Sequence, residues 1–218
     1  MTDYVRPALP KQLFYDAAGN VIDYGNRWHD RPGRMPPEDT YSVDSHPERF
    51  APLHTVADAL IEHLRQNYEV TVEEGITFAR ELLKPPDNVL RAVRITPANP
   101  DGAPLTFVFT SYPGITVHAG LLHDFPFPQC GCDACDETPE SIADELESIV
   151  LAVVAGGYKE SVDPGAELPI GYQLASDTHR RSGHTRIAGY PAERVAASTT
   201  QLRSLADGWQ PWLQRSTI

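Results

Sequence analysis

Proline constrains the fold of this 218-residue chain more than any other feature. The 20 prolines are concentrated before residue 53 and between about residues 85 and 139. Each proline fixes the backbone angle φ and removes a backbone N–H, so regular elements are interrupted wherever prolines cluster. The sequence therefore predicts short elements joined by many fixed corners in these two stretches.

The first 52 residues are predicted to form a long hairpin followed by an irregular arm. Residues 13–16 and 21–24 have the character of two short strands, and the Gly19-Asn20 pair between them tolerates the positive φ of a hairpin turn. No periodicity is visible between residues 25 and 52. Irregular stretches of that length are usually either functional or disordered. Its large aromatic residues predict that this one packs as an ordered arm: Trp28, Tyr41 and Phe50.

Two helices are predicted directly after the arm. Apolar residues recur at helical spacing over residues 53–67. Thr71 and Glu74 match a capping box, in which the hydroxyl and the carboxylate each accept a hydrogen bond from a free backbone N–H. A second helix is therefore expected over residues 72–83, before two consecutive prolines stop it.

The middle of the chain predicts an antiparallel meander, and two more helices follow. Turn sequences rich in Pro, Gly and Asn separate three strand-like segments, which are residues 89–96, 105–110 and 115–119. Thr138 is a suitable N-cap for a helix that ends at Gly156. A weaker helix is expected over residues 191–207.

Helices and strands segregate along the chain instead of alternating, which favours an α+β fold over a doubly wound sheet. We expect one α+β domain over residues 1–218, built as an antiparallel β-meander packed by several helices. Its expected parts are the hairpin and arm (1–52), the helices, meander, cysteine loop and helix (53–157), and a C-terminal segment with a helix (158–218).

The charge balance limits the classes of partner. The chain has 30 acidic and 18 basic residues, a formal net charge of -12. A field of this sign repels phosphate backbones and anionic lipids, so neither nucleic-acid nor membrane binding is expected. The longest apolar run, Ile149 to Ala155, is too short to cross a bilayer. A basic protein is the partner that this charge would attract.

Three cysteines within six positions carry the most specific chemical signal. Cys132 and Cys135 have the two-residue spacing that lets two sulfurs face one metal ion. Cys130 lies two positions before Cys132, and residues two apart in extended backbone point to the same side. Zinc usually takes four ligands, so the sequence predicts a Zn²⁺ site with a histidine as the fourth ligand. His123 is the nearest imidazole and His118 the second.

Two other interpretations of the cysteines remain open. They can be reduced side chains in an ordered turn, or Cys132 and Cys135 can form a redox pair. An odd cysteine count in one short segment gives no disulfide framework and is typical of a reducing, cytoplasmic compartment. The negative charge of four nearby carboxylates disfavours free thiolates, and a divalent cation bound to the sulfurs would compensate that charge. The four carboxylates are Asp124, Asp133, Asp136 and Glu137.

Two further clusters are candidate ligand sites. Arg27, Trp28 and His29 combine a cation, an aromatic ring and an imidazole at the start of the arm, which suits either an anionic or planar ligand or an anchor for the arm. His179 to Arg186 is the only dense basic cluster. It can bind a phosphate or carboxylate, but a solvated loop is the simpler interpretation.

Two segments of the chain carry a resemblance: Phe125 to Glu137 (FPFPQCGCDACDE) and Tyr15 to Trp28 (YDAAGNVIDYGNRW). They resemble an uncharacterised family of bacterial, mainly actinobacterial, proteins with a C-G-C-D-A-C-D-E motif. The resemblance spans most of the chain and implies no established activity. It makes the cysteine cluster and the tyrosine-rich hairpin more plausible as shared features.

Three functions follow from these observations. The leading hypothesis is a non-enzymatic intracellular protein with a structural zinc site and a protein-partner or regulatory role. The first alternative is a zinc-dependent hydrolase in which Asp136 or Glu137 polarises water on the same cysteine-bound ion. The second alternative is a small-ligand binding module built on Arg27, Trp28 and the arm.

Overall fold

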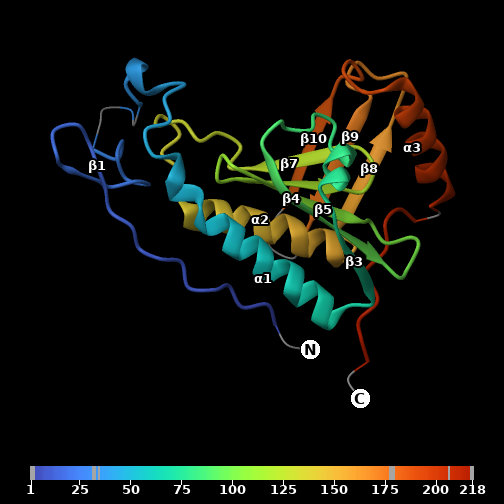
Figure 1. Ribbon diagram of the computed structural model, residues 1–218. Helices are drawn as coiled ribbons and strands as arrows, with labels where there is room; N and C mark the ends of the chain where they lie inside the picture. The colour runs from blue at the N-terminus through green and yellow to red at the C-terminus, as the bar shows by residue number, and fades with distance from the viewer. Residues whose placement is uncertain (1–2, 31–32, 34, 177–179, 206, 217–218) are drawn as a thin grey trace.

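The fold is α+β, and the computed structural model describes residues 3–30, 33, 35–176, 180–205 and 207–216. Its main sheet has five antiparallel strands in the order β3-β4-β5-β6-β7 (Figure 1). The strands of this sheet are β3 (Val70–Glu74), β4 (Val89–Pro97), β5 (Leu105–Thr110), β6 (Ile115–Ala119) and β7 (His123–Phe127). The three strands predicted from turn chemistry are β4, β5 and β6, so the meander is confirmed.

Two long helices lie side by side on one face of this sheet (Figure 1). They are α1 (Pro52–Asn67) and α2 (Pro139–Val154), as the helical periodicity predicted. Thr138 caps α2, because its side chain accepts from the Ser141 backbone N–H at 3.1 Å. The apolar stripes of both helices and the inward side chains of the sheet form the main core. A fully buried leucine such as Leu60 contributes about 2 kcal/mol through removal of apolar surface from water.

The helix predicted over residues 72–83 is wrong. Residues 70–74 form β3, which pairs with β4 in register from Val70 opposite Pro97 to Glu74 opposite Val93. Val70 and Val72 are half-buried while Thr71 and Glu73 are exposed, which is the alternation of an edge strand. Only a 3-10 helix, η4 (Ile76–Glu81), follows this strand, on the sheet face opposite α1 and α2. Pairing along five residues outweighs the local capping pattern of Thr71 and Glu74.

A second sheet occupies the stretch for which the sequence predicted no element. Its order is β10-β9-β8, with β8 (Tyr158–Val162), β9 (Ile170–Ala175) and β10 (Arg180–Thr185). The basic cluster therefore lies on a strand and not in a solvated loop, and its first member, His179, is outside the described residues. Arg181 in this strand forms an ion pair with Glu145 of α2. The predicted C-terminal helix is confirmed as α3 (Ala192–Ser204).

The hairpin and arm extend from one end of the molecule (Figure 1). The hairpin is short, with β1 (Phe14–Tyr15) paired to β2 (Val21–Ile22) as the turn sequence predicted. Two 3-10 helices, η2 (Glu38–Thr40) and η3 (Pro47–Phe50), give the arm its local structure. In the part of the chain that the structure describes, no helix is both long and apolar enough to cross a membrane.

Candidate metal centre

The three cysteine sulfurs converge in the loop between β7 and α2. The Cys130 and Cys132 Sγ atoms are 3.2 Å apart, and the Cys132 and Cys135 Sγ atoms are 3.5 Å apart. All three sulfurs lie within 4.8 Å of one another. Tetrahedral zinc with Zn–S bonds of about 2.3 Å places its sulfur ligands about 3.8 Å apart. The two shorter separations are slightly below this value, and the trio is grouped closely enough to hold one metal ion.

The local backbone explains this convergence. A turn brings the Cys135 backbone N–H onto the Cys132 carbonyl at 3.1 Å, so both side chains leave the same turn. Gly131 passes so close to Tyr112 that a Cβ atom would lie 1.8 Å from the tyrosine hydroxyl oxygen. A larger residue at this position would force the Tyr112 side chain or the loop to shift, which favours glycine between Cys130 and Cys132.

The protonation of the thiols depends on whether a cation is present. Burial, together with hydrogen bonds and charge from the other two sulfurs, raises the pKa of the Cys135 thiol to about 12. Burial also acts to raise the pKa of Cys132, but hydrogen bonds from Cys130 and from backbone N–H groups outweigh it and lower that pKa. The three sulfurs therefore cannot all be thiolates at neutral pH without a compensating positive charge, which a divalent ion supplies on binding.

The arm holds the cysteine loop through backbone contacts. The Asp133 N–H donates to the Val43 carbonyl at 2.7 Å, and the Ala134 N–H donates to Thr40 at 3.1 Å. The buried Asp133 carboxylate accepts from the Ser45 hydroxyl at 2.6 Å. The described part of the arm therefore packs against the cysteine loop.

Arg49 connects the arm, the start of α1 and the cysteine loop. Its side chain is only 1% exposed, and its guanidinium lies 4.3 Å from the ring centroid of Tyr24. The guanidinium donates to three backbone carbonyls, those of Gly131 (2.8 Å), His46 (2.9 Å) and Glu137 (3.3 Å). Two of these carbonyls belong to the cysteine loop, so a single buried cation fixes both ends of that loop. The sequence analysis missed Arg49, because nothing in its neighbourhood distinguishes it from a surface arginine.

Arg27 and Trp28 also contact the cysteine loop. The Trp28 indole N–H donates to the Ala134 carbonyl at 3.0 Å, and the Arg27 backbone N–H donates to the Asp136 carboxylate at 2.9 Å. The Arg27 guanidinium lies 4.6 Å from the Trp28 ring centroid. His29 is exposed beside Asp30. These are the contacts of an anchor, which was one of the two interpretations of this cluster.

The two carboxylates considered as hydrolytic bases belong to the packing of the loop. Asp136 is buried and Glu137 is half-buried, and burial raises the pKa of each carboxyl above its ordinary value. Among the described residues, no carboxylate or imidazole shares the close grouping of the three sulfurs. Neither Asp136 nor Glu137 is therefore placed as a ligand.

The structure does not bring His118 and His123 to the cysteines. His118 Nδ1 is 2.6 Å from the Asp124 carboxylate, and His123 Nδ1 is 3.0 Å from the buried Glu160 carboxylate. His123 begins β7 and the cysteine loop follows its other end, so the strand separates them by about 13 Å at 3.3 Å per residue. Spacing along the chain suggested otherwise because the Phe-Pro-Phe-Pro segment was not recognised as a strand.

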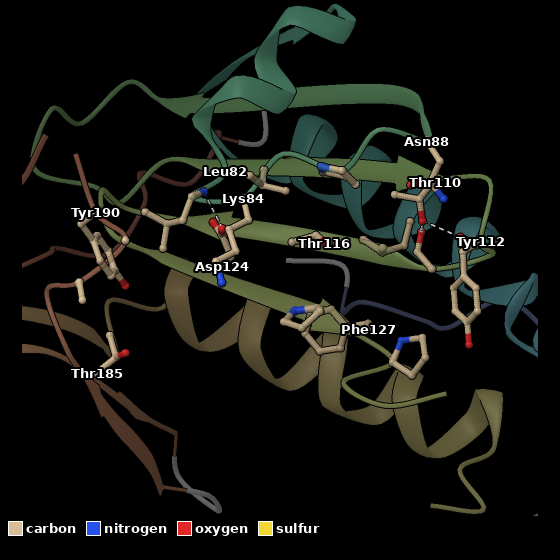
Figure 2. Close-up of a pocket in the computed structure, with 18 residues that line it drawn as sticks. Leu82, Lys84, Asn88, Thr110, Tyr112, Thr116, Asp124, Phe127, Thr185 and Tyr190 are labelled. Carbon is tan, nitrogen blue, oxygen red and sulfur yellow. Dashed lines mark hydrogen bonds between the residues drawn. The ribbon is translucent and has the colours of Figure 1, made fainter. Parts of the chain in front are cut away.

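A pocket of about 540 Å³ lies next to the cysteine loop, on the sheet face opposite α1 and α2 (Figure 2). Tyr190 and Thr185 lie at one end and Tyr112 and Asn88 at the other. The carboxylate of Asp124 accepts from the Leu83 backbone N–H at 2.7 Å in its wall. None of the three cysteines lines this pocket.

The chain matches a family model over residues 10–216, and the description of that model is "Family of unknown function (DUF6226)". The match covers nearly the whole chain, so the protein belongs to this family. No curated protein and no solved structure matches the chain.

Proposed function

We propose that this member of the DUF6226 family is a zinc protein in which Cys130, Cys132 and Cys135 bind one Zn²⁺ ion. The observation that carries the proposal is the grouping of all three sulfurs within 4.8 Å on a loop held by the buried Arg49. Thiolates are soft ligands that suit zinc among the common divalent ions. The ion would offset most of the charge of the three thiolates and hold the cysteine loop against which the arm packs, so its main role is structural.

The fourth ligand comes from outside the cysteine loop in this proposal. Cys130 and Cys135 are exposed, so the ion would lie at the protein surface with one coordination position facing solvent. A water molecule or a side chain of a partner protein can occupy that position. The surface around it belongs to a chain with a net charge of -12, which favours a basic protein as the partner.

Metal analysis of protein purified without a metal-chelating tag tests the zinc proposal. We expect about one zinc per chain, and we expect Cys132→Ser to lower both the zinc content and the melting temperature because metal binding and folding are linked. His118→Gln is the control for zinc content alone, since its ring nitrogens contact Asp124 and Arg194 and not the sulfurs, and it should retain the zinc. Equal zinc content in both variants, or none in the wild type, would refute the proposal.

The partner role has its own test. The wild type and Cys132→Ser are compared as baits in native lysate at low and high salt. A basic protein retained at low salt by the wild type alone would support a partner that depends on the zinc loop. If no protein is retained in stoichiometric amount under mild salt, the partner role is wrong while the zinc site stands.

A zinc-dependent hydrolase is the second candidate, and the exposure of Cys130 and Cys135 favours it, because water could reach an ion bound there. Catalytic zinc keeps an open coordination position for water. Zinc-loaded protein would then hydrolyse an activated ester such as p-nitrophenyl acetate faster than zinc alone, and Glu137→Gln would abolish the difference. No rate above that of zinc alone would leave only the structural role.

A further inference from the structure

The sheet face opposite α1 and α2 carries a row of polar side chains that crosses four strands. Arg94 of β4 pairs with Thr106 of β5, Thr106 pairs with His118 of β6, and His118 pairs with Asp124 of β7. Residues directly opposite each other in an antiparallel sheet point to the same face. Thr106 is 1% exposed and His118 4% exposed, so the two central residues of the row are buried although they are polar.

A cavity of about 360 Å³ lies over this row. Its lining includes residues from the sheet, from η4 and from α3, among them Glu81, Arg94, Thr106, His118, Arg194 and Ser198. This cavity is distinct from the pocket of Figure 2. The two are neighbours, because His118 lines the smaller cavity and its hydrogen-bond partner Asp124 lines the larger pocket. A concave lining with several polar side chains can bind a polar ligand.

One wall of the cavity holds Arg194 in a fixed position. Arg194 Nε and Nη2 donate to the Leu121 carbonyl at 3.0 and 2.8 Å, and Nη2 also lies 3.0 Å from His118 Nε2. A guanidinium can only donate, so His118 Nε2 accepts and the Nδ1 proton is donated to Asp124. His118, oriented by Asp124, therefore positions the Arg194 guanidinium.

The other wall carries Arg94. Arg94 Nη1 lies 3.2 Å from a Glu81 carboxylate oxygen, and the other oxygen of Glu81 accepts from the Thr106 hydroxyl. Arg94 Nε is buried and has no hydrogen-bond partner among the described residues. Two arginines against one glutamate give the lining an excess positive charge, within a chain whose net charge is -12.

We propose that this cavity binds a small molecule through a carboxylate or phosphate group held between Arg94 and Arg194. Both groups are oxyanions that accept N–H donors of a guanidinium, and Arg94 and Arg194 both line the cavity. The cavity volume limits the ligand to a small metabolite. This site is separate from the cysteine loop, so it stands or falls independently of the zinc proposal.

Calorimetry and thermal unfolding at constant ionic strength test the proposal with inorganic phosphate, succinate and chloride. We expect a saturable heat and a rise in melting temperature with phosphate or succinate but not with chloride. A response to phosphate alone assigns the site to phosphorylated ligands, and a response to succinate alone assigns it to carboxylates. Either result supports an oxyanion site.

Three variants locate the site. Arg194→Gln and Arg94→Gln should each raise the dissociation constant about tenfold to a hundredfold, because each removes a charged hydrogen-bond donor. Arg203→Gln is the matched control, since it removes the same charge from an exposed position of α3 and should leave binding unchanged. If Arg194→Gln fails to fold, Arg94→Gln carries the test, because its side chain is partly exposed. No binding by the wild type, or equal binding by all variants, would overturn the proposal.

Discussion

Replacing Arg49 by methionine should destabilise the protein. Methionine keeps much of the side-chain length but removes the charge and all three hydrogen bonds to the carbonyls of Gly131, His46 and Glu137. Each such bond contributes about 1 kcal/mol after exchange with water is counted, so the expected loss of unfolding free energy is about 3 kcal/mol. For a chain of this length, that loss lowers the melting temperature by about 6–12 °C.

The assay is thermal unfolding followed by circular dichroism on Arg49→Met and on the control Arg65→Met. Arg65 pairs with Glu62 on the exposed face of α1, and both side chains are about half exposed, so its loss should leave the melting temperature unchanged within error. Arg49→Met should also bind less zinc, because two of the lost bonds hold the cysteine loop. If both variants melt within about 1 °C of the wild type, the argument that Arg49 holds the loop is wrong.

Three further predictions use other parts of the molecule. Thr138→Ala removes the N-cap of α2 and should lower the unfolding free energy by about 1 kcal/mol in chemical denaturation, whereas Thr200→Ala on exposed α3 should change it by less than about 0.5 kcal/mol. Glu160→Gln should lower the unfolding free energy by about 3 kcal/mol in the same assay. The reason is that the buried Glu160 carboxylate accepts hydrogen bonds from the Leu121 and Leu122 backbone N–H groups and from the Trp209 indole. An unchanged denaturation midpoint would contradict this prediction. Burial lowers the pKa of His63. The neutral imidazole of His63 therefore contributes to the stability of the folded protein above pH 6.5, and this contribution is lost as the pH falls through the lowered pKa. An NMR titration midpoint at or above 6.5 would contradict this prediction.

The parts of the fold that were predictable are those with a strong local signal. The apolar stripes of two helices, α1 and α2, were visible in the sequence, as was the cap of α2 at Thr138. The turn sequences were enough to predict three strands of the meander. β3 was mistaken for a helix because its partner β4 lies about 20 residues away, which a local pattern does not report. β7 was missed because it contains Pro126, which only an edge strand tolerates.

The candidate site was predictable to a similar extent. The spacing of the three cysteines was enough to predict their convergence, because it depends only on one turn. The partners of that loop come from residues 27–49, about 90 residues earlier, and only the tertiary structure brings Arg49 and Ser45 to it. The polar row under the smaller cavity was missed for the same reason. Its members are spread over four strands, and the register between strands decides that they meet.

X-ray absorption at the zinc K-edge, on protein purified without a metal-chelating tag, tests the central inference most directly. We expect about one zinc per chain, bound by three sulfur atoms at about 2.3 Å and by one oxygen or nitrogen atom. A first shell made only of oxygen and nitrogen, or the absence of zinc from pure protein, would contradict it.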